Sequence, residues 1–95
     1  MINFKDLVIN SDEKLCYLKG NPIKLTKSEY NILSFILNNR NKIFSREELI
    51  NNAWKEPVTN RAVDTAISRL RKKIGEYSTN IVSRIGFGYG FIENI

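Results

Sequence analysis

Residues 60–75, NRAVDTAISRLRKKIG, decide the fold of this chain of 95 amino acids. When successive residues are placed about 100° apart, as in an α-helix, several aliphatic side chains fall within about 40° of one another. They are Val63, Ile67, Leu70 and Ile74. An apolar stripe of this kind predicts a helix that is anchored in a core by one side. Gly75 is expected to end the helix, because glycine readily adopts the left-handed conformation found just after helix ends.

The opposite side of the same predicted helix is polar and basic. The side chains there are Arg61, Thr65, Ser68 and Lys72, with Arg69 on one shoulder and Asp64 and Arg71 on the other. An α-helix fits the major groove of DNA, where small polar groups can approach base edges and flanking cations can hold phosphates. From the helix alone, a basic face that is merely solvated is an equally good interpretation.

Two capping boxes predict the helices that precede it. Thr26 with Glu29, and Ser45 with Glu48, each place a hydroxyl and a carboxylate at the spacing that satisfies the first amides of a helix. The first helix is expected to run to about Asn39, and its buried stripe is Tyr30, Ile32, Leu33, Ile36 and Leu37. The second is expected to run through Ala53.

Trp54 closes the second helix, and the segment after it reads as a short loop because Pro57 cannot donate to a helix ladder. Asn60 is then expected as the N-cap of the basic helix. Two helices joined by a short link, the second of them basic, outline a helix-turn-helix.

The two ends of the chain read as β-structure. Residues 1–25 alternate between apolar and polar positions and predict three or four short antiparallel strands. Residues 80–93 predict a hairpin with strands over 81–85 and 89–92, joined by a glycine-rich tip. Together with a three-helix core over 26–75, this is a single α+β domain of 95 residues, a winged helix-turn-helix whose C-terminal hairpin is the wing.

Composition narrows the functional class. Fifteen Lys and Arg against ten Asp and Glu give a net charge of +5 and an isoelectric point near 9.5, which favours an anionic partner. The chain has no histidine, no phosphate-binding glycine loop and no nucleophile motif, so we expect neither an enzyme nor a cofactor or metal site. Cys16 is alone and is expected to be a small apolar strand residue. Without a membrane span or signal-peptide pattern, we expect a cytoplasmic chain that does not bind membranes.

Four segments in fixed order carry a resemblance to a known family. They are LTKSEYNIL, SREELI with Trp54 after it, RAVDTAISRLRKKIG and GFGYGF, which together extend from Leu25 to Phe91. In this order they resemble the OmpR/PhoB-type winged helix, the output domain of bacterial two-component response regulators. The strands expected over residues 1–25 are similar to the N-terminal sheet of that family.

The resemblance implies sequence-specific binding of double-stranded DNA for transcription regulation, with the helix over 60–75 in the major groove. The positions that face bases are Arg69, Ser68, Thr65, Ala66 and Ala62. The positions that grip phosphate are Arg46, Trp54, Arg61, Arg71, Lys72 and Tyr89, and the wing positions are Arg84, Gly86, Phe87 and Gly88. For Trp54 and Tyr89, packing inside the domain is an equally good interpretation. Ala66 is expected to make an apolar contact, for instance with a thymine methyl group.

The resemblance also implies partners. Relatives bind direct repeats as head-to-tail pairs, so we expect a dimer on DNA. They contact RNA polymerase through the loop that corresponds to residues 55–60, which is about two residues shorter here. The main alternative to DNA binding is a winged helix that holds an acidic protein partner, because a fold does not fix its function.

One departure from the family lies in the wing. The family usually has an arginine directly before the first glycine of the tip, where it enters the minor groove, whereas Arg84 stands one residue earlier. Two interpretations are open. Either the wing is shifted or lengthened by one residue, or the minor-groove arginine is missing.

Overall fold

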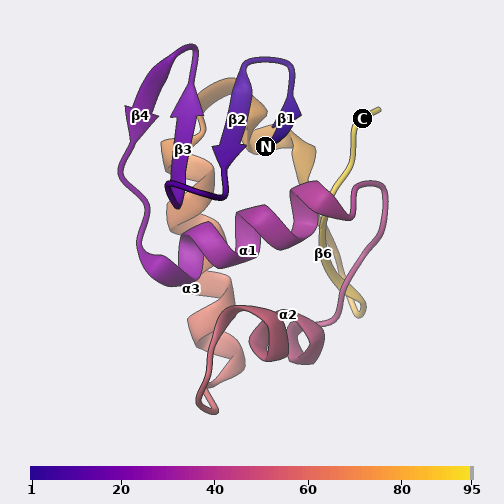
Figure 1. Cartoon of the computed structure of the whole chain (residues 1–95). Coiled ribbons are helices and arrows are strands. Elements are labelled where there is room, and N and C mark those ends of the chain that lie inside the picture. The colour runs from indigo at the N-terminus through magenta and orange to yellow at the C-terminus, as the bar shows by residue number, and fades with distance from the viewer. Residues whose placement is uncertain (95) are drawn as a thin grey trace.

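The computed structural model describes residues 1–94, which begin with a four-stranded antiparallel sheet. Its strands follow one another in space as in sequence: β1 (Ile2–Phe4), β2 (Leu7–Asn10), β3 (Leu15–Leu18) and β4 (Asn21–Ile23). Figure 1 shows this sheet above helix α1, with α3 behind both. Cys16 in β3 is 1% exposed and faces the core beside Ile9, its partner in β2. The expected N-terminal sheet is therefore confirmed, with four strands.

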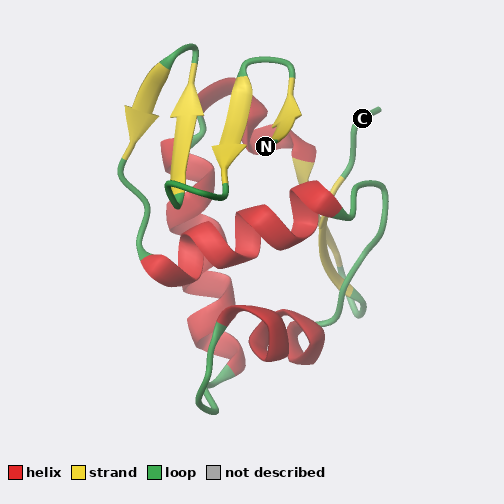
Figure 2. Cartoon of the chain, viewed as in Figure 1, coloured by secondary structure: helices red, strands yellow, loops and turns green. Residues whose placement is uncertain are grey.

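Three helices follow, as the sequence predicts (Figure 2). They are α1 (Lys27–Asn38), α2 (Arg46–Ala53) and α3 (Asn60–Lys73). Both capping boxes are present, because the Thr26 and Ser45 hydroxyls accept from the backbone of Glu29 and Glu48, whose carboxylates accept in return. The capping residues therefore fix where α1 and α2 begin.

Glu29 has a second partner that the sequence did not reveal. Its side chain is 1% exposed, and Lys73 at the end of α3 donates to its Oε1 at 2.6 Å. Burial by itself raises the pKa of Glu29, but the hydrogen bonds from Lys73 and Thr26 outweigh it and the net pKa is lowered. This pair joins the first turn of α1 to the last turn of α3.

The start of α3 differs from expectation by one residue. Thr59 is the N-cap, with extended backbone angles and a side chain that accepts from the amide of Ala62, whereas Asn60 is already helical. Both residues have side chains suited to capping, and the extended path of the preceding loop places Thr59 at the boundary. The expectation that Asn60 caps the helix was wrong.

Helix α3 ends at Lys73, and Gly75, two residues later, has the left-handed φ of 59° that was expected just after the helix end. A short 3₁₀ helix, η1 (Gly75–Asn80), follows and was not predicted. It buries Tyr77, whose hydroxyl donates to Asp6 in the turn after β1. This contact closes the core beneath the N-terminal sheet.

One core holds the sheet, the helices and the C-terminal hairpin together. Its fully buried side chains come from every layer and include Leu7, Ile9, Ile32, Leu33, Ile36, Leu37, Leu49, Ile67, Leu70, Ile74, Ile81 and Phe91. Burial of side chains of this size is worth roughly 1.5–3 kcal/mol each, so the apolar stripe of α3 is firmly fixed. None of the helices in residues 1–94 is long and apolar enough to cross a membrane.

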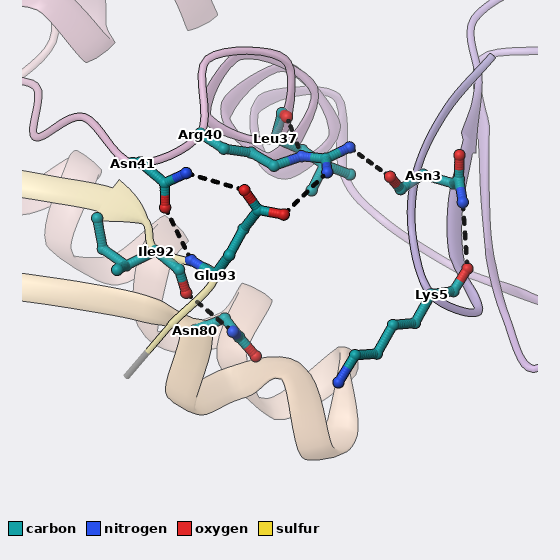
Figure 3. Close-up of polar contacts among 8 residues, drawn as sticks. All are labelled: Asn3, Lys5, Leu37, Arg40, Asn41, Asn80, Ile92 and Glu93. Carbon is teal, nitrogen blue, oxygen red and sulfur yellow. Dashed lines mark hydrogen bonds and ion pairs between the residues drawn. The ribbon is translucent and has the colours of Figure 1, made fainter.

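Arg40, just beyond α1, links both ends of the described chain (Figure 3). Its guanidinium donates to the carbonyls of Leu37 and Asn3 and to the carboxylate of Glu93. Asn41 makes two further bonds with Glu93: its Nδ2 donates to Glu93 Oε1 at 2.8 Å, and its Oδ1 accepts from the Glu93 backbone N–H at 3.0 Å. The first strand and the segment after the last strand are thereby held against the same end of α1.

Candidate nucleic-acid interface

Most of the residues predicted for the outer face of α3 are exposed, and Thr65 is half-buried. Arg61, Ser68, Arg69 and Lys72 are exposed, whereas Val63, Ile67 and Leu70 are at most 1% exposed. Among residues 1–94, no ion pair involves Arg61, Arg69 or Lys72. The outer face of α3 thus presents several cations that the described part of the domain does not neutralise.

Ala66 is less exposed than the other expected base-contacting residues. It is 6% exposed and belongs to the core cluster, because it lies about 60° from Val63 on the helix, at the edge of the apolar stripe. It also lines the open hollow that Arg61, Thr65 and Arg69 share, so its expected apolar contact with a base stays a prediction. Ala62 and Thr65 are half-buried and lie between the core and the exposed face.

Arg46, the first residue of α2, is held by Asp64 of α3. Its Nε donates to Asp64 Oδ1 at 2.9 Å and its Nη2 donates to Oδ2 at 3.1 Å, a two-pronged geometry that fixes the plane of the guanidinium. The Tyr89 hydroxyl of the C-terminal hairpin donates to Oδ1 of the same carboxylate at 2.5 Å. One carboxylate therefore connects α2, α3 and the hairpin, and both of its partners are expected phosphate ligands.

The protonation of this cluster follows from its contacts. Hydrogen bonds from Arg46 and Tyr89 lower the pKa of Asp64, and the hydrogen bond to Asp64 raises the pKa of Arg46. Burial, followed by the bond to Asp64, raises the pKa of Tyr89. At neutral pH the cluster consists of a carboxylate, a guanidinium and a neutral phenol, so its net charge is close to zero.

Arg71 has a role in the fold that the sequence did not reveal. Its Nη2 donates to the carbonyl of Ile81 at 2.6 Å and to the hydroxyl of Ser83 at 3.1 Å, and its Nε reaches the same carbonyl at 3.2 Å. The guanidinium also lies 5.9 Å from the centre of the Tyr89 ring. Arg71 thus fastens α3 to the hairpin, and most of its donors are engaged there.

Trp54 lies at the end of α2, half-buried and packed against the core. It also lines an open hollow of about 450 Å³ between the start of α1 and the outer face of α3, together with Thr59, Arg61, Thr65 and Arg69. Both interpretations of Trp54 are therefore compatible with its position. The ring helps to anchor α2, and part of it borders the surface on which Arg61 and Arg69 lie.

The wing is a hairpin of β5 (Ile81–Arg84) and β6 (Gly88–Phe91), each strand ending one residue earlier than expected and β6 also beginning one earlier. On its other side β6 is bonded to Phe44, through Phe44 N to Tyr89 O at 2.8 Å and Tyr89 N to Phe44 O at 3.0 Å. Gly88 has a φ of 135°, and a Cβ there would lie 1.9 Å from the carbonyl oxygen of Phe44. The close approach of Gly88 fixes the register of β6 beside the segment that leads into α2.

This register places Arg84 within the hairpin and not at its tip. Arg84 pairs with Gly88 as the last residue of β5, and the tip consists of Ile85, Gly86 and Phe87, closed by a bond from Phe87 N to Arg84 O at 2.9 Å. Ser83 faces Arg71, so Arg84 points to the other face of the hairpin. The tip itself therefore carries no cation, and the nearest one, Arg84, lies at the end of β5.

The comparisons with known proteins agree with this geometry. The family model described as "Transcriptional regulatory protein, C terminal" matches residues 20–91. The transcriptional regulatory protein SrrA of Staphylococcus aureus is 33% identical over 97 residues, which cover 96% of this chain and 40% of SrrA. The chain therefore spans less than half the length of this curated relative.

Two solved structures show the same fold. The DNA-binding domain of the response regulator AdeR, crystallised in complex with an intercistronic region, has a TM-score of 0.86 at 30% identity, covering 98% of this chain and 99% of that one. The response regulator DrrB, an OmpR/PhoB homologue from Thermotoga maritima, has a TM-score of 0.84 at 38% identity, covering 96% and 43%. The chain belongs to the family of C-terminal domains of transcriptional regulatory proteins, with the winged-helix fold of OmpR/PhoB-type response regulators.

Proposed function

We propose that this chain binds double-stranded DNA in a sequence-specific manner and regulates transcription, as the output domain of a response regulator. The observation that carries the proposal is the outer face of α3, where Arg61, Arg69 and Lys72 are exposed while the opposite face is locked in the core. A helix fixed in this way can enter the major groove without rearrangement of the domain. The related AdeR DNA-binding domain was crystallised in complex with an intercistronic region, which supports DNA binding by a domain of this fold.

The side chains divide by what they can reach. Arg69 and Ser68 project from the middle of α3 and are assigned to base edges, with Thr65, Ala66 and Ala62 beside them. Phosphates are assigned to residues around the border of this face, namely Arg46, Trp54, Arg61, Arg71, Lys72 and Tyr89, with Arg71 contributing only what its bonds to β5 leave available. Phosphate contacts set the position of the protein, and base contacts set its preference.

The proposal includes partners that belong to the whole regulator. Direct repeats in the DNA would be occupied by two copies arranged head to tail, forming a dimer on DNA. The loop over residues 55–60 would contact RNA polymerase. Regulation of this kind takes place beside the chromosome, so we assign the protein to the cytoplasm.

The test is selection of bound duplexes from a randomised pool, followed by gel-shift assays on the selected sequences. We expect a recurring motif in two copies at fixed spacing. We also expect log K to fall with log salt by about 0.9 for each phosphate that the protein neutralises. Failure to retard either selected or random genomic fragments at micromolar protein would contradict DNA binding and favour a module that holds an acidic protein.

A further inference from the structure

The tip of the wing is the most exposed apolar part of the described chain. Ile85 is 98% exposed and Phe87 is 75% exposed, and the two flank Gly86, whose φ of 84° makes the tight turn between them. A folded domain rarely presents two large apolar side chains at the point of a hairpin without a partner for them. The question is which partner the geometry provides.

The surroundings of the tip connect it to the proposed DNA surface. Ile85 and Phe87 form one wall of an open hollow of about 660 Å³. The opposite wall contains Arg46 and Glu47 at the start of α2 and Asn60 at the start of α3. In the proposed complex with α3 in the major groove, the sugar-phosphate backbone that borders that groove would pass this hollow on the side of Arg46. The tip then lies beyond the backbone, at the adjacent minor groove.

We propose that Ile85 and Phe87 form an apolar wedge that contacts the minor groove of double-stranded DNA. Apolar side chains contact sugar faces and base edges there, and they partly unstack a base step when they press into it. Such a contact favours easily deformed pyrimidine–purine steps, so the wedge contributes sequence preference at a position that no hydrogen bond reads. This inference rests on the proposed DNA binding and gives the wing a chemistry different from that of a minor-groove arginine.

Charge around the tip fits this assignment. Arg84 precedes the tip and points to the face of the hairpin away from Arg71, where it can reach a phosphate of either strand that borders the minor groove. The cation and the wedge therefore have separate tasks. Arg84 contributes a salt-dependent contact, and Ile85 with Phe87 contributes a contact that releases no counterions.

The experiment measures DNA affinity as a function of salt for Ile85→Ala, Phe87→Ala and Arg84→Ala on a selected duplex with a single half-site. Because transfer of one large apolar side chain from water is worth about one to two factors of ten in affinity, each apolar truncation should weaken binding by roughly tenfold. The slope of log K against log salt should stay unchanged for these two variants. For Arg84→Ala the slope should fall in magnitude by about 0.9.

A second measurement tests the wedge directly. A 2-aminopurine placed at the base step beneath the tip should brighten when the wild-type domain binds, because unstacking relieves its quenching, and should stay dark with Ile85→Ala/Phe87→Ala. Replacing that step by a stiff A-tract should weaken DNA binding by the wild-type protein but not by the double variant. Leu15→Ala is the matched control, because it removes an exposed apolar side chain far along the chain, on β3. It should change neither the DNA affinity nor the 2-aminopurine fluorescence.

The results that would contradict the wedge differ from the result that would contradict DNA binding. Wild-type-like affinity and fluorescence for the double variant overturn the wedge while leaving DNA binding intact. A loss that appears only on tandem sites, and not on the single half-site, also overturns it and assigns the tip to contact between neighbouring copies. Absence of binding by the wild-type domain to any selected duplex contradicts the proposed function itself.

Discussion

The carboxylate of Asp64 holds the guanidinium of Arg46 through two hydrogen bonds, at 2.9 and 3.1 Å, which join the middle of α3 to the first residue of α2. Tyr89 adds a third bond from the wing. An acidic residue beside a DNA-binding face opposes phosphate binding by its charge. Its position here fits a compensating role, which is to orient Arg46 and Tyr89, the two proposed phosphate ligands, before DNA arrives.

Arg46→Ala should weaken binding to selected and random duplexes by the same factor and reduce the salt slope by about 0.9, because a phosphate contact carries no sequence information. Asp64→Ala should also weaken binding, and its effect should be smaller in the Arg46→Ala background, where only the orientation of Tyr89 is left to lose. Gel-shift titrations at several salt concentrations measure all three. Tighter binding by Asp64→Ala would show that its charge, and not its orienting effect, dominates.

Arg69→Ala tests the assignment of base contacts. A two-pronged contact from arginine to guanine is worth about 1–3 kcal/mol of discrimination, so this variant should lose affinity for the selected site and relax preference at one base position. Lys72→Ala, one turn away on the same exposed face, is the control and should weaken all sequences alike. Equal losses of both variants on specific and random duplexes would contradict the division of roles.

The Glu29–Lys73 pair should make a measurable contribution to stability. Glu29→Ala leaves Lys73 and the Thr26 amide without their acceptor and should cost about 2–4 kcal/mol in the free energy of unfolding. Glu48→Ala removes the same capping contact on α2, where the side chain is exposed, and should cost only about 1 kcal/mol. Urea titrations followed by circular dichroism compare the two. Equal costs would mean that the contact with Lys73 adds nothing.

The same pair predicts a dependence on pH. The folded-state pKa of Glu29 lies below its ordinary value of 4.5, so its ionised form stabilises the fold fully above that pH. The stability advantage of the wild type over Glu29→Gln should therefore shrink as the pH falls below 4.5 and through the folded-state pKa. Unfolding titrations of both proteins over this range measure it, and a constant difference would contradict the assignment.

Gly88→Ala should destabilise the wing and its junction with α2. The new Cβ would lie 1.9 Å from a backbone oxygen, and the φ of 135° is strained for any L side chain, so the cost should be about 3 kcal/mol or more. Gly86→Ala is the control, because a Cβ there meets nothing within 4 Å and only the backbone strain of about 1–2 kcal/mol remains. Thermal unfolding of both variants tests the difference.

Cys16 should report on opening of the core. Burial raises the pKa of its thiol to about 11, so little thiolate exists at pH 8, and the side chain is 1% exposed. A thiol reagent should react with the native domain more slowly than with the unfolded chain by on the order of 100-fold or more, because reaction must await local opening. Comparable rates would show that the N-terminal sheet opens readily.

The sequence was sufficient for the elements whose signals are local. Capping boxes at Thr26 and Ser45 and the apolar stripe of α3 depend on spacings of a few residues, and all of them appear in the structure. The exposed faces of these helices follow directly from the same spacings. Hence the fold and the outer face of α3 were predictable.

Contacts between elements were not predictable in this way. Asp64 and Arg46 are 18 residues apart, and Arg71 finds the carbonyl of Ile81 only because η1 turns the chain back along α3. The mistaken N-cap at Asn60 has a similar origin. The cap at Thr59 and the edge of the buried stripe at Ala66 both depend on how neighbouring elements pack, which periodicity does not encode.

The contacts of Arg40 place Asn3 and Glu93 side by side, so the two ends of the described chain share one pole of the molecule. In Figure 1 that pole lies near the four-stranded sheet, while α2 and the turn of the hairpin lie toward the opposite pole. A fluorescent dye or surface tether coupled beside either residue would therefore sit far from an incoming duplex. Single-molecule or immobilised assays can use either end without obstructing the proposed DNA-binding face.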